Sequence, residues 1–234
     1  MAEIRRIETK KGFETLAESL REQILDGSIA PGHILNEREI VEKSGLSRGS
    51  VREAFRVLET EGLVSTRRGR NGGRVVLQPD GDVLRRSLDL FIRGQQVSPA
   101  LLAETIQVFA PALAELAARH RTSEDIATLE DCLDKLDRIT DSLRFVRANI
   151  QWHLAVARAS HNPVLVSIYQ VIGPDLLTPK TEGFANKQIR NNTINAERRV
   201  LDAIVEQDSS LARRRMEKHI KAYNEEIELV SGGQ

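Results

Sequence analysis

A short helix, a tight turn and a longer helix between residues 37 and 61 constrain the fold of this chain most strongly. The first helix is expected over Glu37–Lys43, where Asn36 can cap it and Glu39 completes a capping-box-like pattern. It stops at the turn Ser44-Gly45-Leu46, and a second helix is expected over Ser47–Glu61, with its first serine as the cap. Two helices joined by so short a glycine-containing turn predict a helix-turn-helix.

The second of these helices has an apolar side, which would pack inward, and a side on which arginine recurs every four residues. Small Gly49 and Ser50 lie beside the first arginine, so the start of the helix can approach DNA bases closely, and arginine can contact guanine edges or phosphate. An ordinary amphipathic helix with a solvated basic side is the alternative. The arginines are Arg48, Arg52 and Arg56, and the apolar residues are Val51, Ala54 and Leu58.

A basic hairpin is expected directly after the second helix. Two β-prone runs, Leu63–Thr66 and Arg74–Leu77, flank a segment rich in glycine and arginine. A wing of this kind next to a helix-turn-helix favours DNA binding over a merely solvated loop. The arginines between Gly62 and Gln78 are Arg67, Arg68, Arg70 and Arg74, and no acidic residue interrupts them.

The best linker candidate is Gln78–Asp82, and it divides the chain into an N-terminal domain over residues 1–78 and a C-terminal domain over 79–234. We therefore expect a mainly α protein: a winged helix-turn-helix with a small β-hairpin, then an all-α bundle. Gly173-Pro174 is predicted to kink or break its helix. The C-terminal helices are expected over 83–94, 99–120, 123–139, 142–160, 163–178, 187–207 and 209–229.

Composition agrees with a helical, non-secreted protein. Aromatic residues make up only 4% of the chain, and Lys plus Arg equals Asp plus Glu at 34 each, which excludes a uniformly basic nucleic-acid binder but allows a local basic surface. Cys132 is the single cysteine, so no disulfide can form within the chain. No signal sequence and no apolar run long enough to cross a bilayer are recognised, so a cytoplasmic protein without a membrane partner is predicted.

The N-terminal part resembles the GntR family of bacterial regulators over about residues 12–77. The resemblance is carried by the runs Ile34–Glu39, Gly45–Ala54 and Leu58–Val64. It implies that DNA is contacted by Arg38 and by the start of the second helix, and that the wing tip enters the minor groove. The residues so implied are Arg38, Ser47, Arg48, Gly49, Ser50 and Arg52, with Arg68, Gly69 and Arg70 in the wing.

The helical part resembles the FCD domain of the FadR subfamily, over about residues 83–229. The residues that carry this resemblance are Leu116–Ala118, His153, Ala157–Pro163, Asp202–Ile204, Asp208, Ala212, Met216 and His219. It implies a helical bundle that binds an effector and forms a homodimer.

Many FCD domains hold a divalent metal ion with one aspartate and three histidines on different helices. The resemblance places Asn149, His153, Glu197 and His219 at these positions, so two of the expected ligands match and two depart. Two imidazoles and a carboxylate can still bind one zinc, nickel or manganese ion per subunit, with the amide as a weak extra ligand. A polar pocket without metal is the alternative.

The effector pocket is expected around the same four residues, together with Ile106 and Gln107. Many relatives carry an arginine at the position of Ile106, where it suits a carboxylate ligand. Its absence weakens the expectation that the effector is a small organic acid.

The sequence therefore predicts a regulator, most simply a repressor, that binds double-stranded operator DNA under the control of a small molecule. No nucleophile elbow, P-loop or dinucleotide fingerprint is present, so no catalytic residue is predicted. Two alternatives remain: a metal-dependent enzyme using the helical cavity, and a DNA-binding scaffold whose helical domain only dimerises. Turnover of a candidate ligand would indicate the enzyme, and a ligand-dependent thermal shift would separate sensor from scaffold.

Overall fold

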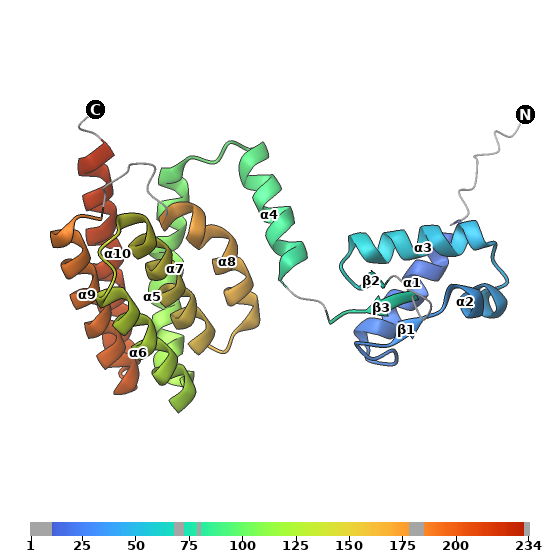
Figure 1. Ribbon diagram of the computed structural model, residues 1–234, viewed down its shortest axis with the longest axis horizontal. Coiled ribbons are helices and arrows are strands. Elements are labelled where there is room, and N and C mark those ends of the chain that lie inside the picture. The colour runs from blue at the N-terminus through green and yellow to red at the C-terminus, as the bar shows by residue number, and fades with distance from the viewer. Residues whose placement is uncertain (1–10, 68–72, 79–80, 178–184, 232–234) are drawn as a thin grey trace, which may run out of the picture. The chain divides into compact units, whose positions relative to one another are not determined.

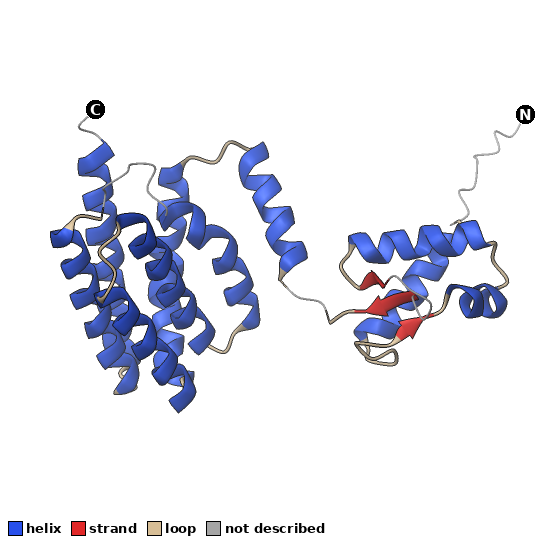
Figure 2. Ribbon diagram, viewed as in Figure 1, coloured by secondary structure: helices blue, strands red, loops and turns tan. Residues whose placement is uncertain are grey.

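The computed structural model describes residues 11–67, 73–78, 81–177 and 185–231. The chain forms two compact units, Met1–Val83 and Leu84–Gln234. The secondary structure of each unit is shown in Figure 2.

The N-terminal unit combines three helices with a small antiparallel sheet, labelled in Figure 1. The sheet has the order β1-β3-β2, and β3 pairs with both neighbours, so that Val75 lies opposite Ile34 on one side and Ser65 on the other. This is the predicted winged helix-turn-helix. Its elements are α1 (Gly12–Leu25), β1 (Ile34–Leu35), α2 (Glu37–Ser44), α3 (Arg48–Thr60), β2 (Val64–Arg67) and β3 (Gly73–Val76).

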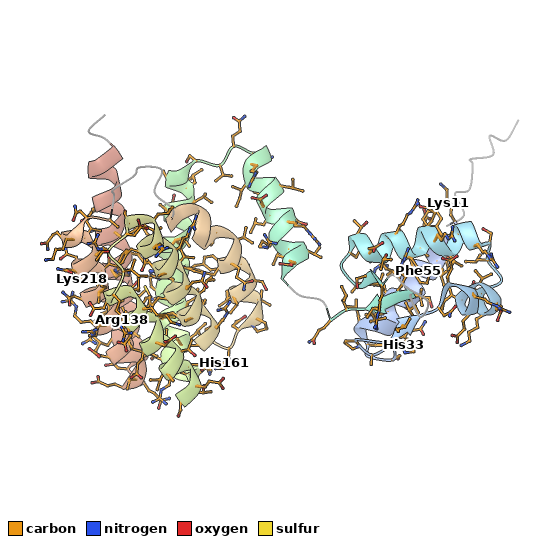
Figure 3. All side chains as sticks on the ribbon, in the orientation of Figure 1. Lys11, His33, Phe55, Arg138, His161 and Lys218 are labelled. Atoms are coloured by element: carbon orange, nitrogen blue, oxygen red, sulfur yellow. The ribbon has the colours of Figure 1, made fainter. Side chains whose placement is uncertain are left out.

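The core of this unit is built from one side of α1, the inward side of α3 and the sheet. Phe55, labelled in Figure 3, is buried between these elements, and Arg21 of α1 pairs with Glu61 at the end of α3 at 2.6 Å. The predicted apolar side of α3 is confirmed, because its members are fully buried and therefore fix which side of the helix remains outside. These members are Val51, Ala54 and Leu58.

Short-range capping determines where α2 and α3 begin. Asn36 Oδ1 accepts a hydrogen bond from the backbone N–H of Arg38 at 2.9 Å, and Ser47 Oγ accepts one from Ser50 at 3.1 Å. Between the helices, Gly45 adopts a left-handed φ of 68°, which a side chain would strain. The capping box at α2 is only half formed, because the Glu39 carboxylate binds Lys43 Nζ at 2.6 Å instead of reaching back to the cap.

The described part of the C-terminal unit contains only helices and the turns and loops that join them, as predicted. The long helix α5 packs against α7, α8, α9 and α10, and α9 and α10 form an antiparallel pair joined by a tight turn (Figure 1). Together with the N-terminal unit, this confirms the mainly α fold class. The helices are α4 (Asp82–Gly94), α5 (Pro99–His120), α6 (Ser123–Asp137), α7 (Ser142–Ala159), α8 (Pro163–Leu177), α9 (Lys187–Val205) and α10 (Ser209–Ser231).

Of the kink or break predicted at Gly173-Pro174, the break is wrong, because α8 continues through these residues to Leu177. Gly173 has a packing role instead. A Cβ atom added there would lie 2.9 Å from Cε1 of the fully buried Tyr169 ring, closer than carbon atoms tolerate. The glycine therefore makes room for this tyrosine within the bundle.

The expectation that no apolar run could cross a bilayer is also corrected. The segment Ala100–His120 within α5 has a mean hydropathy of 1.4 over 18 residues. By length and composition alone, it is long and apolar enough to cross a bilayer. In the structure this apolar character serves the core, since Ile106, Leu113 and Ala114 are buried against the surrounding helices. A central bundle helix needs such a composition for packing alone.

Candidate functional site

Three helices of the C-terminal unit bring four polar side chains into its interior. Asn149 and His153 lie one turn apart on α7, Glu197 lies on α9 and His219 lies on α10. All four are at most 5% exposed, in a core that is otherwise almost entirely apolar. Polar groups rarely enter such a core unless they bind one another or a ligand.

The imidazoles and the carboxylate converge on one point. His153 Nε2 lies 3.4 Å from His219 Nε2, and Glu197 Oε1 lies 3.6 Å and 3.8 Å from these two nitrogens. A circle through the three atoms has a radius of about 2.1 Å, which is the length of a zinc–nitrogen or zinc–oxygen bond. One position is therefore within bonding distance of all three ligand atoms, and His153, Glu197 and His219 fit a divalent metal ion.

The carboxylate of Glu197 has no hydrogen-bond donor among the described residues. Both of its oxygens are buried and unpartnered, and burial raises the pKa of this carboxyl well above its usual value. A buried carboxylate without donors is unfavourable unless it takes up a proton or binds a cation. A cation at the convergence point would satisfy it directly.

The two histidines are held in the form that binds metals. Burial lowers the pKa of His219 to about 4, and burial together with repulsion from His219 lowers the pKa of His153 well below 6.5. Both rings are therefore neutral near pH 7, each with a nitrogen lone pair available. Their direct Nε2–Nε2 contact is longer than the usual hydrogen-bond range of about 2.7–3.2 Å, so it satisfies neither ring well.

Of the other residues predicted for this pocket, Ile106 is fully buried in the same core, whereas Gln107 is exposed. The Oδ1 atom of Asn149 is buried and has no hydrogen-bond partner among the residues that the structure describes. An unpartnered amide oxygen is suited to a metal ion or to a donor on a ligand.

Two further polar groups lie near the cluster. The hydroxyl of Tyr169 on α8 and Nε1 of Trp152 on α7 are both buried without partners in the described part of the chain. Burial and the nearby charge of Glu197 raise the pKa of Tyr169, and the Trp152 ring contacts His153 edge-on with centroids 5.0 Å apart. The sequence does not single out Tyr169, because this residue lies within the apolar segment Pro163–Gly173, whose pattern indicates only a buried helix.

In the N-terminal unit, the outward side of the helix-turn-helix carries the predicted arginines. Arg52 Nε on α3 donates to both carboxylate oxygens of Glu37 on α2, at 2.9 and 3.1 Å. Arg38 Nε binds Glu42 at 2.9 Å within α2. Because these pairs use Nε, the terminal nitrogens of both guanidinium groups remain available for an external anion.

The start of α3 is open and exposed. Arg48 is exposed and makes no ion pair with any described residue, and a Cβ at Gly49 would meet only Ser47 Oγ, at 3.7 Å. Ser47 and Ser50 are joined by their hydroxyls at 3.0 Å. The predicted wing-tip residues Arg68, Gly69 and Arg70 lie outside the described residues.

Two known protein families match this chain, one in the N-terminal unit and one in the C-terminal unit. Residues 13–75 match the family described as bacterial regulatory proteins, gntR family, and residues 102–222 match the FCD domain. These matches cover the winged helix-turn-helix and the helical bundle respectively, and the second contains the buried cluster.

Individual relatives extend over most of the chain. The chain is 30% identical over 216 residues to the Uxu operon regulator of Haemophilus influenzae, covering 89% of this chain and 79% of that protein. It is 26% identical over 220 residues to the HTH-type transcriptional repressor NanR of Salmonella typhimurium, covering 91% and 83%. A solved structure, Streptococcus agalactiae GntR, aligns with a TM-score of 0.69 at 24% identity over 90% of this chain and 98% of that one, and supports the fold.

The matched families and relatives are transcription regulators rather than enzymes, so the enzymatic alternative is set aside. The chain belongs to the GntR family of bacterial regulatory proteins, with an FCD domain as its helical half, and is a DNA-binding transcriptional regulator.

Proposed function

We propose that this protein is a repressor whose affinity for operator DNA is controlled by a divalent metal ion and a small molecule in the helical bundle. The observation that carries the proposal is the convergence of His153 Nε2, Glu197 Oε1 and His219 Nε2 on one buried point. A repressor is favoured because the NanR relative bears that description.

For DNA recognition, we propose that Arg48 and Arg52 of α3 contact bases or phosphates in the major groove. They lie one turn apart on the exposed side of the helix, and Glu37 holds the guanidinium of Arg52 in place. The other proposed contacts come from Arg38, from Ser47, Gly49 and Ser50, and from Arg68, Gly69 and Arg70 of the wing.

In the helical bundle, His153, Glu197 and His219 would hold zinc, nickel or manganese, with Asn149 as a weaker fourth ligand. A metal ion of this kind acts as a Lewis acid that can bind the oxygen atoms of a small effector, for which an organic acid is one candidate. Asn149, Tyr169 and Trp152 supply unpartnered polar atoms that can select and orient such a molecule. The predicted pocket also includes the buried Ile106, with Gln107 next to it.

The active species is proposed to be a cytoplasmic homodimer on a two-fold symmetric operator, because one winged helix reads only a short site. The helical domain is the expected dimerisation element. Large apolar side chains remain exposed on α4 and α5, which supports this role. They include Leu90, Phe91, Leu101 and Val108. The functional division is proposed at residues 78 and 79.

A nickel titration of chelator-treated full-length protein tests the sensor proposal. Trp152 is the single tryptophan, and its ring contacts His153, so a paramagnetic ion at the cluster should quench its fluorescence. Calorimetry should give about one ion per chain. Quenching should be lost in His153→Ala and His219→Ala and retained in His161→Ala, which removes an exposed histidine paired with Asp125.

Equal quenching and equal stoichiometry in all four proteins would place the ion elsewhere. If no protein binds nickel, zinc or manganese, the cluster is a metal-free polar pocket. DNA binding is tested separately, with an operator selected from random duplexes. Loss of a base-contacting arginine should cost about 1–3 kcal/mol, so unchanged affinity in both Arg48→Ala and Arg52→Ala would remove the recognition assignment.

A further inference from the structure

A hollow lies on the surface between α9 and α10. It is an open groove of about 700 Å³, formed where these two antiparallel helices pack. Its walls come from residues that recur along one side of each helix, with small alanines among them. A hollow of this size is in the range of about 300–1,000 Å³ found for small-molecule sites.

The groove is strongly basic, although the protein as a whole is neutral. Three arginines and one lysine line it, against a single carboxylate, that of Asp202. Cations gathered around a concave surface reinforce one another's field and concentrate anions there. The basic residues are Arg198 and Arg199 on α9 and Arg215 and Lys218 on α10.

These cations are not neutralised by neighbours. Within the described part of the chain, the side chains of Arg198, Arg199 and Lys218 form no ion pair, and all three are exposed. Lys218 is labelled on the bundle in Figure 3. Arg215 is half-buried and donates from Nη1 to the backbone carbonyl of Arg199, which ties the two walls together and leaves its other N–H groups for a ligand.

We infer that the groove between α9 and α10 is a binding site for a small, multiply charged anion of the phosphate or polycarboxylate class. Like charges are held close together here without ion-pair partners among the described residues, and a di- or trivalent anion would neutralise several at once through charge-assisted hydrogen bonds. A concave site of this volume suits a small molecule better than a DNA backbone, which needs a long accessible strip.

His219 connects the groove with the interior, since it lines the groove while its Nε2 points to His153 and Glu197. Its Nδ1 is therefore the ring nitrogen left for a partner outside the cluster. An anion that accepts a hydrogen bond from Nδ1–H would fix the tautomer of this ring. Anion binding itself requires no metal ion, so it remains testable whether or not the cluster holds one.

The test is calorimetric titration of chelator-treated full-length protein with inorganic phosphate, pyrophosphate and citrate, with acetate as the singly charged control. Saturable binding of at least one polyanion, about one per chain, is expected, and acetate should bind far more weakly. Arg199→Ala and Lys218→Ala should each weaken binding at least about tenfold. Arg214→Ala, an exposed arginine on α10 outside the groove, is the matched control and should change affinity less than about twofold.

The inference is overturned if none of the polyanions binds, or if the groove variants and Arg214→Ala bind them equally. It is also overturned if a random DNA duplex binds through Arg199 and Lys218 while the small polyanions do not. Circular dichroism of each variant shows whether the bundle remains folded. Because the substituted side chains are exposed, the variants are expected to keep the wild-type fold. If the polyanion binds normally while nickel fails to quench Trp152, the groove stands and only the metal proposal fails.

Discussion

The rings of His153 and His219 are stacked at 10° with their centroids 5.3 Å apart, and their Nε2 atoms lie 3.4 Å from each other in the core of the bundle. Two buried imidazoles so close together cannot both be protonated, and neither finds a good hydrogen-bond partner in the other. The geometry of the pair therefore fits a metal ion placed between the two rings and Glu197.

The metal-free protein should lose stability in acid because of His219. The pKa of His219 is about 4 in the folded protein, below the value of 6.5 in the unfolded chain. Between pH 6.5 and pH 4, His219 is therefore protonated in the unfolded chain but neutral in the folded protein. Stability therefore falls as the pH decreases through this window, by about 3 kcal/mol for this residue. Glu197, with its raised pKa, contributes in the opposite direction, so a comparison is needed to isolate the histidine.

That comparison is denaturant unfolding of the metal-free wild type and His219→Gln at pH 7, 6 and 5. The variant cannot take up this proton in either state, while Glu197 is present in both proteins. Wild type should lose more stability than the variant as the pH falls. Parallel loss in the two proteins would show that His219 does not titrate as its burial requires.

Glu37 should act on DNA specificity through Arg52. Glu37→Gln keeps the shape of the side chain but removes the charge that holds the Arg52 guanidinium through both carboxylate oxygens. Since the pair is exposed, we expect the ratio of operator to random-duplex affinity to fall by roughly fivefold, or about 1 kcal/mol. Glu53→Gln, which releases Arg56 instead, is the control and should leave the ratio unchanged. A ratio unaffected by Glu37→Gln would mean that this ion pair does not position Arg52.

Adding even one methyl group at Gly173 should lower the stability of the protein. Gly173→Ala places a methyl group against the Tyr169 ring at 2.9 Å and should destabilise the protein by about 1–3 kcal/mol in denaturant unfolding. Gly94→Ala, at the end of α4 with no atom near the added Cβ, should be neutral or slightly stabilising. Equal stability of the two variants would contradict the packing role of Gly173.

Exposed apolar residues of α5 should be needed for dimer formation. Leu101 is 55% and Val108 is 66% exposed, and they lie two turns apart on the same side of the helix. The double variant Leu101→Asp, Val108→Asp should be monomeric by light scattering at micromolar concentration, whereas the wild type should be dimeric. Val205→Asp, at an exposed site at the end of α9, is the control. A dimeric double variant would place the interface on another surface.

The sequence predicts most of the fold because its signals are local. The apolar side of α3, the cap at Ser47 and the linker after Gln78 can be recognised from neighbouring residues alone. The strand β1 is missed because it has only two residues and forms by pairing with β3, a contact distant in sequence. The capping box predicted at the start of α2 forms only in part, because Glu39 makes an ion pair with Lys43 instead.

The site is less predictable from local patterns. Family resemblance alone points to Asn149, His153, Glu197 and His219, and the structure brings the last three together from three helices. No spacing rule could do this, since the contacts depend on how α7, α9 and α10 pack. Tyr169 shows the same limit, because its unpartnered hydroxyl becomes visible only once the core around it is known.

The occupancy of the cluster is tested most directly by anomalous X-ray diffraction from crystals of the zinc-loaded full-length protein, measured on both sides of the zinc absorption edge. One anomalous peak per subunit is expected, within about 2.0–2.2 Å of His153 Nε2, His219 Nε2 and a carboxylate oxygen of Glu197. A peak only at another set of side chains, or none at the cluster at full zinc loading, would contradict the metal site formed by His153, Glu197 and His219.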